Sequence, residues 1–61
     1  MPMIRVELLK GRSVEQKREF ALVMTAEASR ILKCPADAID VVFIDIDRDS
    51  WAKAGVLVSD R

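Results

Sequence analysis

The sequence predicts an α+β fold: a single β-α-β unit with parallel strands, followed by a short C-terminal hairpin. Three observations predict it. Residues 3–9 alternate in polarity as a strand does, residues 14–32 carry apolar side chains at helical spacing, and an apolar run lies within residues 40–47. Because a long helix joins the two strands, we expect them to be parallel with a right-handed crossover.

The first strand has two unlike faces, since side chains along a strand alternate between its sides. One face is apolar, and we expect it to pack on the helix. The other is mixed, and we expect it to meet another subunit. The apolar face carries Ile4, Val6 and Leu8, and the mixed face carries Met3, Arg5, Glu7 and Leu9.

The helix is predicted from about Val14 to Leu32 or Lys33. Ser13 and Gln16 form a Ser-x-x-Gln capping box after the turn at residues 10–12, where Gly11 supplies backbone freedom. Proline at position 35 ends the helix, because the residue before a proline is pushed away from helical geometry. The apolar stripe consists of Phe20, Val23, Met24, Ala28 and Ile31.

The second half of the chain predicts a turn, a strand and a hairpin. Residues 35–38 are expected to form a turn or a single helical turn, and residues 40–47 a strand whose central run of four apolar residues fits burial on both faces. Residues 48–50 are polar and are expected to form a turn. Residues 51–58 then read as a loop or small hairpin that pivots at Gly55, with residues 56–58 as a short edge strand.

Length and composition indicate one domain, residues 1–61, with a small core. Hydrophobic residues make up 51% of the chain, more than a lone unit of this size can bury, so we expect oligomers. With one cysteine and no histidine, a disulfide within the chain is excluded and a zinc site is not expected. No other feature calls for a metal or a cofactor.

The charge pattern excludes two classes of partner. Ten basic and ten acidic residues balance and are mixed along the chain, which argues against nucleic acid because phosphate binding needs a basic face. No apolar run is long enough to span a bilayer, and Arg5 and Glu7 interrupt the N-terminal run where a signal peptide would be apolar. We therefore expect a cytoplasmic protein with no membrane partner.

Pro2 is an unusual candidate for chemistry. Removal of Met1, which a small second residue permits, would leave it with a free secondary amine at the start of a strand. An apolar pocket and a nearby cation, with Arg12 as the candidate, would lower the pKa of this amine and keep it neutral. On the residues alone, the commoner alternatives are a proline at a strand start, where it costs nothing, and an ordinary exposed arginine.

The order of these features resembles the 4-oxalocrotonate tautomerase family over nearly the whole chain. The resemblance rests on Pro2, the Gly-Arg-Ser segment at residues 11–13, Glu15-Gln16-Lys17-Arg18 and the tail at residues 51–57. It implies dimers that assemble into a hexamer. It also implies an isomerase that acts in the degradation of aromatic compounds by converting enol and keto forms of a 2-hydroxy-dienoate or 2-oxo acid.

The resemblance also implies the site residues. Pro2 would be the general base, Arg12 would bind the carboxylate of a small-molecule substrate, and Trp51 and Leu9 would line an apolar pocket. Trp51 stands where phenylalanine is more familiar in the family. It could equally be an interface aromatic, and both roles hold together if the site lies at a subunit boundary.

Asp40 departs from the family, whose best-known members have a second arginine there, donated by a neighbouring subunit. A carboxylate would repel a dicarboxylate substrate. Either another basic residue reaches the site, or a different subunit supplies the cation, so a homo-hexamer and a hetero-hexamer with a paralogous subunit both stay open. The alternatives to a tautomerase are a non-catalytic or partner-dependent subunit, and a dehalogenase or hydratase on the same scaffold.

Overall fold

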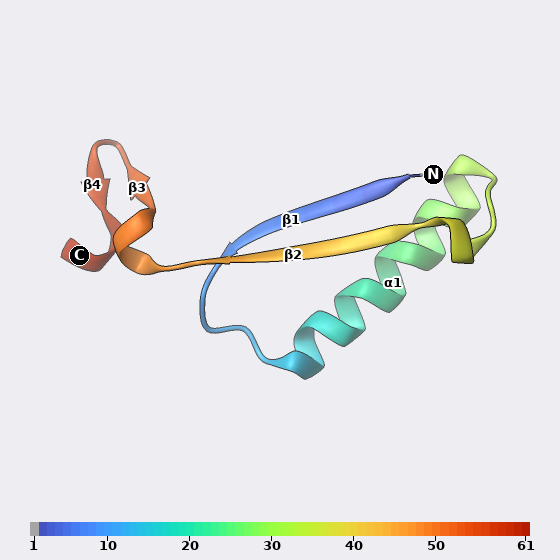
Figure 1. Ribbon diagram of the computed structural model, residues 1–61, viewed down its shortest axis with the longest axis horizontal. Coiled ribbons are helices and arrows are strands. Elements are labelled where there is room, and N and C mark those ends of the chain that lie inside the picture. Colours follow the sequence, from blue (N-terminus) through green and yellow to red (C-terminus); the bar gives the residue numbers. More distant parts are fainter. Residues whose placement is uncertain (1) are drawn as a thin grey trace.

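The structure, a computed structural model, describes residues 2–61, so the expected removal of Met1 concerns a residue outside the described part. Figure 1 shows two long strands lying side by side, with the helix along one face and a small hairpin beyond their far end. The elements are β1 (Met3–Leu9), α1 (Val14–Leu32), β2 (Asp40–Ile46), β3 (Ala52–Lys53) and β4 (Val56–Leu57). Short 3₁₀ turns cover Ala36–Ala38, Arg48–Ser50 and Val58–Asp60.

β1 and β2 are parallel, and their register runs from Met3 opposite Asp40 to Leu9 opposite Ile46. This confirms the predicted β-α-β unit. β2 ends at Ile46 rather than at the expected Asp47, because Asp47 is the residue from which the 3₁₀ turn of Arg48–Ser50 starts. The apolar side chains of β1 share one side with Phe43 and face α1, as the two-residue period predicts.

The predicted capping box is present at the start of α1. The main-chain N–H of Gln16 donates to Ser13 Oγ over 3.1 Å, and the N–H of Ser13 donates to Gln16 Oε1 over 2.9 Å. At the other end, Lys33 is left-handed (φ 57°) and its N–H donates to the carbonyl of Ser29. Both ends of the helix therefore lie where the sequence predicts them.

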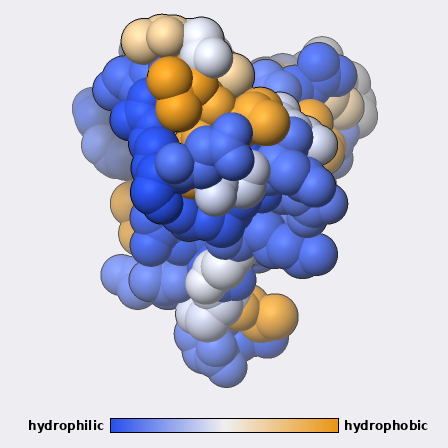
Figure 2. Space-filling view, turned by 90° about the vertical axis from the view of Figure 1, so that its left-hand side faces the viewer, coloured by the Kyte–Doolittle hydropathy of each residue, from blue (hydrophilic) through white to orange (hydrophobic). Residues whose placement is uncertain are grey.

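The C-terminal hairpin is also confirmed. Ala52 pairs with Leu57 and Lys53 with Val56 in an antiparallel ladder, and both residues of the turn, Ala54 and Gly55, have positive φ. The second strand of the hairpin, β4, is shorter than expected, because Val58 already belongs to the terminal 3₁₀ turn. Figure 2 looks onto this end of the molecule and shows hydrophobic surface gathered at the top, over the hairpin.

The apolar stripe of α1 is only partly covered by the strands. Phe20, Val23 and Ile31 are 40%, 51% and 61% exposed. Two strands about 4.8 Å apart make a surface narrower than a helix of about 10 Å diameter, so one flank of the stripe overhangs the sheet. The partly covered positions of α1 are Lys17, Ala21, Met24, Thr25, Ala28 and Ser29.

A single chain buries little of itself. Within residues 2–61, Ile39 (8% exposed) is the only buried hydrophobic residue. The accessible surface is 4840 Å², against about 4,000 Å² for a globular chain of this mass. The radius of gyration is 14.6 Å, against roughly 10.5 Å for a compact domain of this length. Both comparisons favour the expected oligomer.

α1 is the longest helix of the described chain, and it carries charged side chains along its length. Among the described residues, none of the helices combines the length and apolar character that a bilayer crossing requires. In the last turn of α1, Arg30 pairs with Glu27 over 3.0 Å, and this hydrogen bonding raises the pKa of the Arg30 guanidinium.

Candidate active site

Pro2 lies at the start of the sheet, beside the first residue of β2. Its carbonyl oxygen accepts the main-chain N–H of Asp40 over 3.1 Å, and the proline itself is half-buried. This bond fixes the end of the chain against β2, so an amine on Pro2 would have a defined position. Asp40, whose main chain makes this contact, is exposed.

Leu9 and Trp51 gather at the opposite end of the sheet. Leu9 pairs with Ile46, and Ile46 lines a shallow hollow together with Glu7 and Trp51. The carbonyl of Trp51 accepts the N–H of Val58 over 2.8 Å, which closes the base of the hairpin. These residues lie on the side of the sheet that faces away from α1, where the mixed face of β1 also lies.

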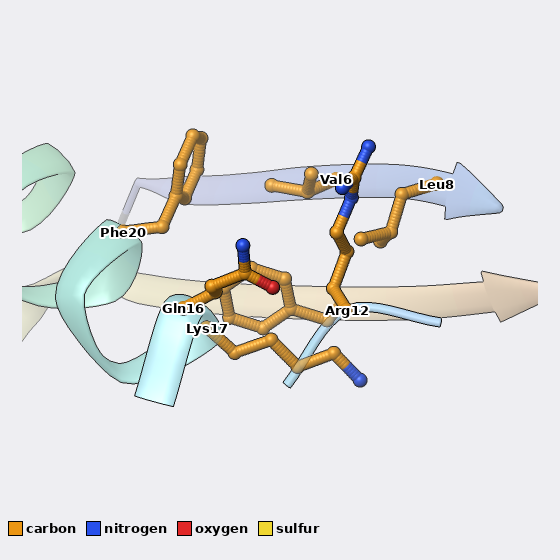
Figure 3. Close-up of a pocket in the computed structure, with 7 residues that line it drawn as sticks. Val6, Leu8, Arg12, Gln16, Lys17 and Phe20 are labelled. Carbon is orange, nitrogen blue, oxygen red and sulfur yellow. The ribbon is translucent and has the colours of Figure 1, made fainter. Parts of the chain in front are cut away.

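Arg12 projects from the loop between β1 and α1 into a pocket of about 260 Å³. Figure 3 shows its side chain reaching across β1 between Val6 and Leu8. Within residues 2–61, no carboxylate lies within salt-bridge distance of the Arg12 guanidinium. The pocket is lined by Val6, Leu8, Arg12, Gln16, Lys17, Phe20 and Phe43.

The walls of this pocket are fixed by two contacts between α1 and β2. The rings of Phe20 and Phe43 meet edge to face with centroids 5.9 Å apart. The ammonium of Lys17 donates to Asp45 over 2.6 Å, so Asp45 neutralises its charge. Arg12 is therefore the cation of the pocket that stays available to an anion.

Sequence reasoning missed Lys17, Phe43 and Gln16 as lining residues. The signal that could have found them is the register of the two strands, which sets Phe43 and Asp45 on the face of β2 toward the first turns of α1. That register depends on a long-range pairing, and residue spacing along one strand does not reveal it.

A single chain does not bring all the expected site residues together. Leu9 ends β1, Arg12 follows it in the loop and Trp51 follows β2, whereas Pro2 precedes β1, so Pro2 lies at the opposite end of the sheet from the other three. The seven residues of β1 separate them by about 23 Å at roughly 3.3 Å per residue. A site that uses both groups must take them from different copies.

The described residues contain no group of three or more His, Cys, Asp or Glu side chains placed to hold a metal ion.

Comparison with known proteins gives a consistent result. A sequence model of a family described as "Tautomerase enzyme" matches residues 2–61. A probable tautomerase of Streptococcus agalactiae is 39% identical over 57 residues, which cover 93% of this chain and 95% of that protein.

Solved structures agree along the whole chain. A 4-oxalocrotonate tautomerase homologue superposes with a TM-score of 0.96 at 43% identity, covering 100% of this chain and 97% of that one. The heterohexamer 4-oxalocrotonate tautomerase of Chloroflexus aurantiacus superposes with a TM-score of 0.92 at 27% identity, covering 98% and 97%.

Proposed function

This chain belongs to the tautomerase family, and we propose that it interconverts the enol and keto forms of a 2-hydroxy-dienoate or 2-oxo acid, with Pro2 as general base after removal of Met1. The observation that carries the proposal is that the two ends of the sheet hold different functional groups. An anchored proline lies at one end, and an available arginine with apolar neighbours lies at the other.

The proposed reaction moves one proton and changes no oxidation state. The neutral amine of Pro2 takes the proton of the enol hydroxyl and returns it to a carbon further along the conjugated chain. The electron pair of the O–H bond becomes the π bond of the C=O group, and the displaced C=C electron pair forms the new C–H bond. Arg12 of another copy binds the substrate carboxylate through paired N–H groups and stabilises the dienolate charge that develops.

Leu9 and Trp51 would provide the apolar walls of this site. Their contribution is to exclude water, which disfavours the protonated amine and so lowers the pKa of Pro2. Arg12 lowers the same pKa by charge repulsion. Both effects favour the base form at neutral pH, and they must outweigh the negative charge of the neighbouring Asp40, which favours the protonated amine.

Asp40 supports a narrower substrate class. Its exposed carboxylate lies beside Pro2, and no basic side chain within residues 2–61 is within salt-bridge distance of it. A substrate with a second carboxylate would meet this charge, so we propose a monocarboxylate whose other end is uncharged.

Asp40 also favours a second candidate function, that of a partner-dependent subunit in a hetero-oligomeric tautomerase. A different chain could bring the cation that this one lacks at that position. One of the structural relatives is itself described as a heterohexamer. A homo-hexamer active alone and a hetero-hexamer active only with its partner are distinguished by assaying the purified chain by itself.

The test of the proposed function is the loss of proton transfer in two variants. Pro2→Ala removes the secondary amine, and a serine inserted before Pro2 converts it to an amide. Each should lower kcat/KM for phenylenolpyruvate by at least about 100-fold, since general-base catalysis contributes roughly that much. Intact mass would show whether Met1 is absent, and equal rates for both variants and the parent would refute the assignment.

A further inference from the structure

The side chain of Gln16 takes part in two structures at once. Its Oε1 atom accepts the main-chain N–H of Ser13 over 2.9 Å as half of the capping box, and the same side chain lines the pocket that holds Arg12. We propose that the Nε2 amide group of Gln16 donates a hydrogen bond to the substrate carboxylate that Arg12 binds, as a second and uncharged donor. This inference rests on the proposed function, because it names a further binding residue of the same site.

The capping box fixes the direction in which the amide of Gln16 faces. A main-chain N–H can only donate, so the atom of Gln16 that meets the N–H of Ser13 must be the oxygen. Within residues 2–61, the oxygen makes all the side-chain hydrogen bonds of Gln16, and the nitrogen has no partner. Figure 3 shows this nitrogen and the Arg12 guanidinium pointing to the same side of the pocket. The two N–H groups of the amide are therefore held in place and free to donate.

The other side chains of the pocket do not compete for an anion. Lys17 donates to Asp45 over 2.6 Å, and this carboxylate neutralises its charge. The remaining lining residues are apolar: Val6, Leu8, Phe20 and Phe43. Arg12 and Gln16 are thus the two lining residues whose donors remain available to a ligand.

A carboxylate can use more donors than one guanidinium supplies. Its two oxygens have about four lone-pair sites, and the paired contact with Arg12 uses two of them. Between apolar walls the other sites are shielded from water, and a charged group that lacks hydrogen bonds there costs free energy. The amide of Gln16 would satisfy one of these sites without adding a charge to the pocket.

An uncharged second donor also agrees with a substrate that has a single carboxylate. A second free cation would attract a dianion, whereas an amide strengthens the binding of one carboxylate alone. The pocket volume of about 260 Å³ is below the range of about 300–1,000 Å³ for pockets that enclose a whole ligand. We therefore expect the pocket to take the carboxylate end of the substrate, with the reacting carbons outside it.

The donor role is tested by two variants that both lack the amide nitrogen. Gln16→Glu keeps an oxygen for the N–H of Ser13, since glutamate serves in a capping box as glutamine does. Gln16→Met keeps the length of the side chain without a donor or a charge, so it excludes an ion pair between the new glutamate and Arg12 as the cause. Each should raise the Kd for 3-phenylpropanoate, an unreactive monocarboxylate, by at least about tenfold in isothermal titration calorimetry.

Two control variants separate this effect from charge and from folding. Ala26→Glu adds the same charge at an exposed position of α1 outside the pocket, and it should bind 3-phenylpropanoate as the parent does. Ser13→Ala weakens the capping box from its other side and keeps the amide nitrogen, so it should raise the Kd less than Gln16→Met does. Urea unfolding at one fixed protein concentration should give Gln16→Glu a midpoint no lower than that of the parent.

An uncharged ligand distinguishes donation from the shape of the pocket. Hydrogen bonds to a neutral group contribute less than those to a charged group, so Gln16→Met should change the Kd for 3-phenylpropan-1-ol less than that for 3-phenylpropanoate. In turnover of phenylenolpyruvate, Gln16→Met should raise KM with little change in kcat, because the carboxylate keeps its charge throughout the reaction. Equal losses of affinity for the two ligands would show that Gln16 only shapes the pocket, and the proposal would be wrong.

Binding is measured without turnover, so the two proposals can fail separately. If both Gln16 variants bind 3-phenylpropanoate as the parent does, or if Arg12→Ala does, the proposed donor role is overturned even where Pro2 proves to be the base. Failure of the parent to bind this ligand would overturn it as well. If the Gln16 variants lose affinity while Pro2→Ala keeps the rate of the parent, the role of Gln16 stands and the proposed function falls.

Discussion

The main-chain N–H of Asp40 donates to the carbonyl oxygen of Pro2 over 3.1 Å. The bond joins the starts of β1 and β2, and it sets an exposed carboxylate next to the residue proposed as base. An anionic substrate that approaches Pro2 must therefore tolerate a negative charge nearby. The choice of substrate should depend on this one side chain.

Asp40→Arg should change the preference between substrates of different charge. The ratio of kcat/KM for 2-hydroxymuconate, a dicarboxylate, to that for phenylenolpyruvate, a monocarboxylate, should rise on the order of tenfold, because repulsion is replaced by attraction at close range. Steady-state assays of both substrates give the ratio.

Two further variants make this measurement specific. Asp40→Asn should raise the ratio less, since it removes repulsion without adding attraction. Asp37→Asn removes a negative charge from the neighbouring 3₁₀ turn and should leave the ratio unchanged. If Asp37→Asn has the same effect as Asp40→Asn, the preference reflects overall charge and the local role of Asp40 is wrong.

Arg12 should be sensitive to the shape of its side chain as well as to its charge. Arg12→Ala should lower kcat/KM on the order of 50-fold, since hydrogen bonds to a charged group are lost. Arg12→Lys should restore only part of the activity, because an ammonium cannot form the paired contact of a guanidinium. Full activity in Arg12→Lys would contradict binding of the carboxylate through two paired hydrogen bonds. Arg18→Ala, on α1, serves as the control.

Local rules were sufficient for the order of the elements and for most of their limits, although β2 and β4 each end one residue earlier than predicted. The alternation in β1, the Ser13–Gln16 box and the glycine of the hairpin act over a few residues, and the structure has each where it was predicted. The exposed flank of α1 was not predicted. The helical period identifies Phe20 and Val23 as apolar, but coverage depends on the width of the sheet beneath them.

Less of the candidate site could be predicted from the sequence, for a related reason. Pro2 and Arg12 were selected by chemistry and by family resemblance, and neither argument reports the distance between them. The length of β1 sets them about 23 Å apart in one chain. The lining residues Lys17 and Phe43 depend on the packing of α1 against β2, which has no signature along the chain.

Trp51 should contribute apolar surface rather than a specific polar contact. Trp51→Ala should raise the KM for phenylenolpyruvate several-fold, because it removes most of an aromatic side chain whose burial contributes about 2 kcal/mol or more. Trp51→Phe should stay close to the parent, since phenylalanine keeps an aromatic wall.

The same pair of variants separates a binding role from an interface role. Sedimentation at the assay concentration should show Trp51→Ala with the assembly of the parent. If the assembly is lost together with activity, Trp51 acts through subunit contacts and its role as a site wall is not supported.

Ser13 should matter to stability and, through it, to the position of Arg12. Its side chain accepts the N–H of Gln16, and its own N–H donates to the Gln16 side chain, so Ser13→Ala removes one hydrogen bond and weakens the other. Loss of such a cap costs about 1 kcal/mol, whereas Ser13→Asp keeps an acceptor at the same place and should retain most of it. Urea unfolding should show the lower midpoint only for Ser13→Ala. It is measured at one fixed protein concentration, because the stability of an oligomer depends on concentration.

Since Arg12 directly precedes the cap, and Gln16 and Lys17 line its pocket, fraying of the first turn should also raise the KM. An unfolding midpoint for Ser13→Asp as low as that for Ser13→Ala would show that the cap does not hold this end of α1.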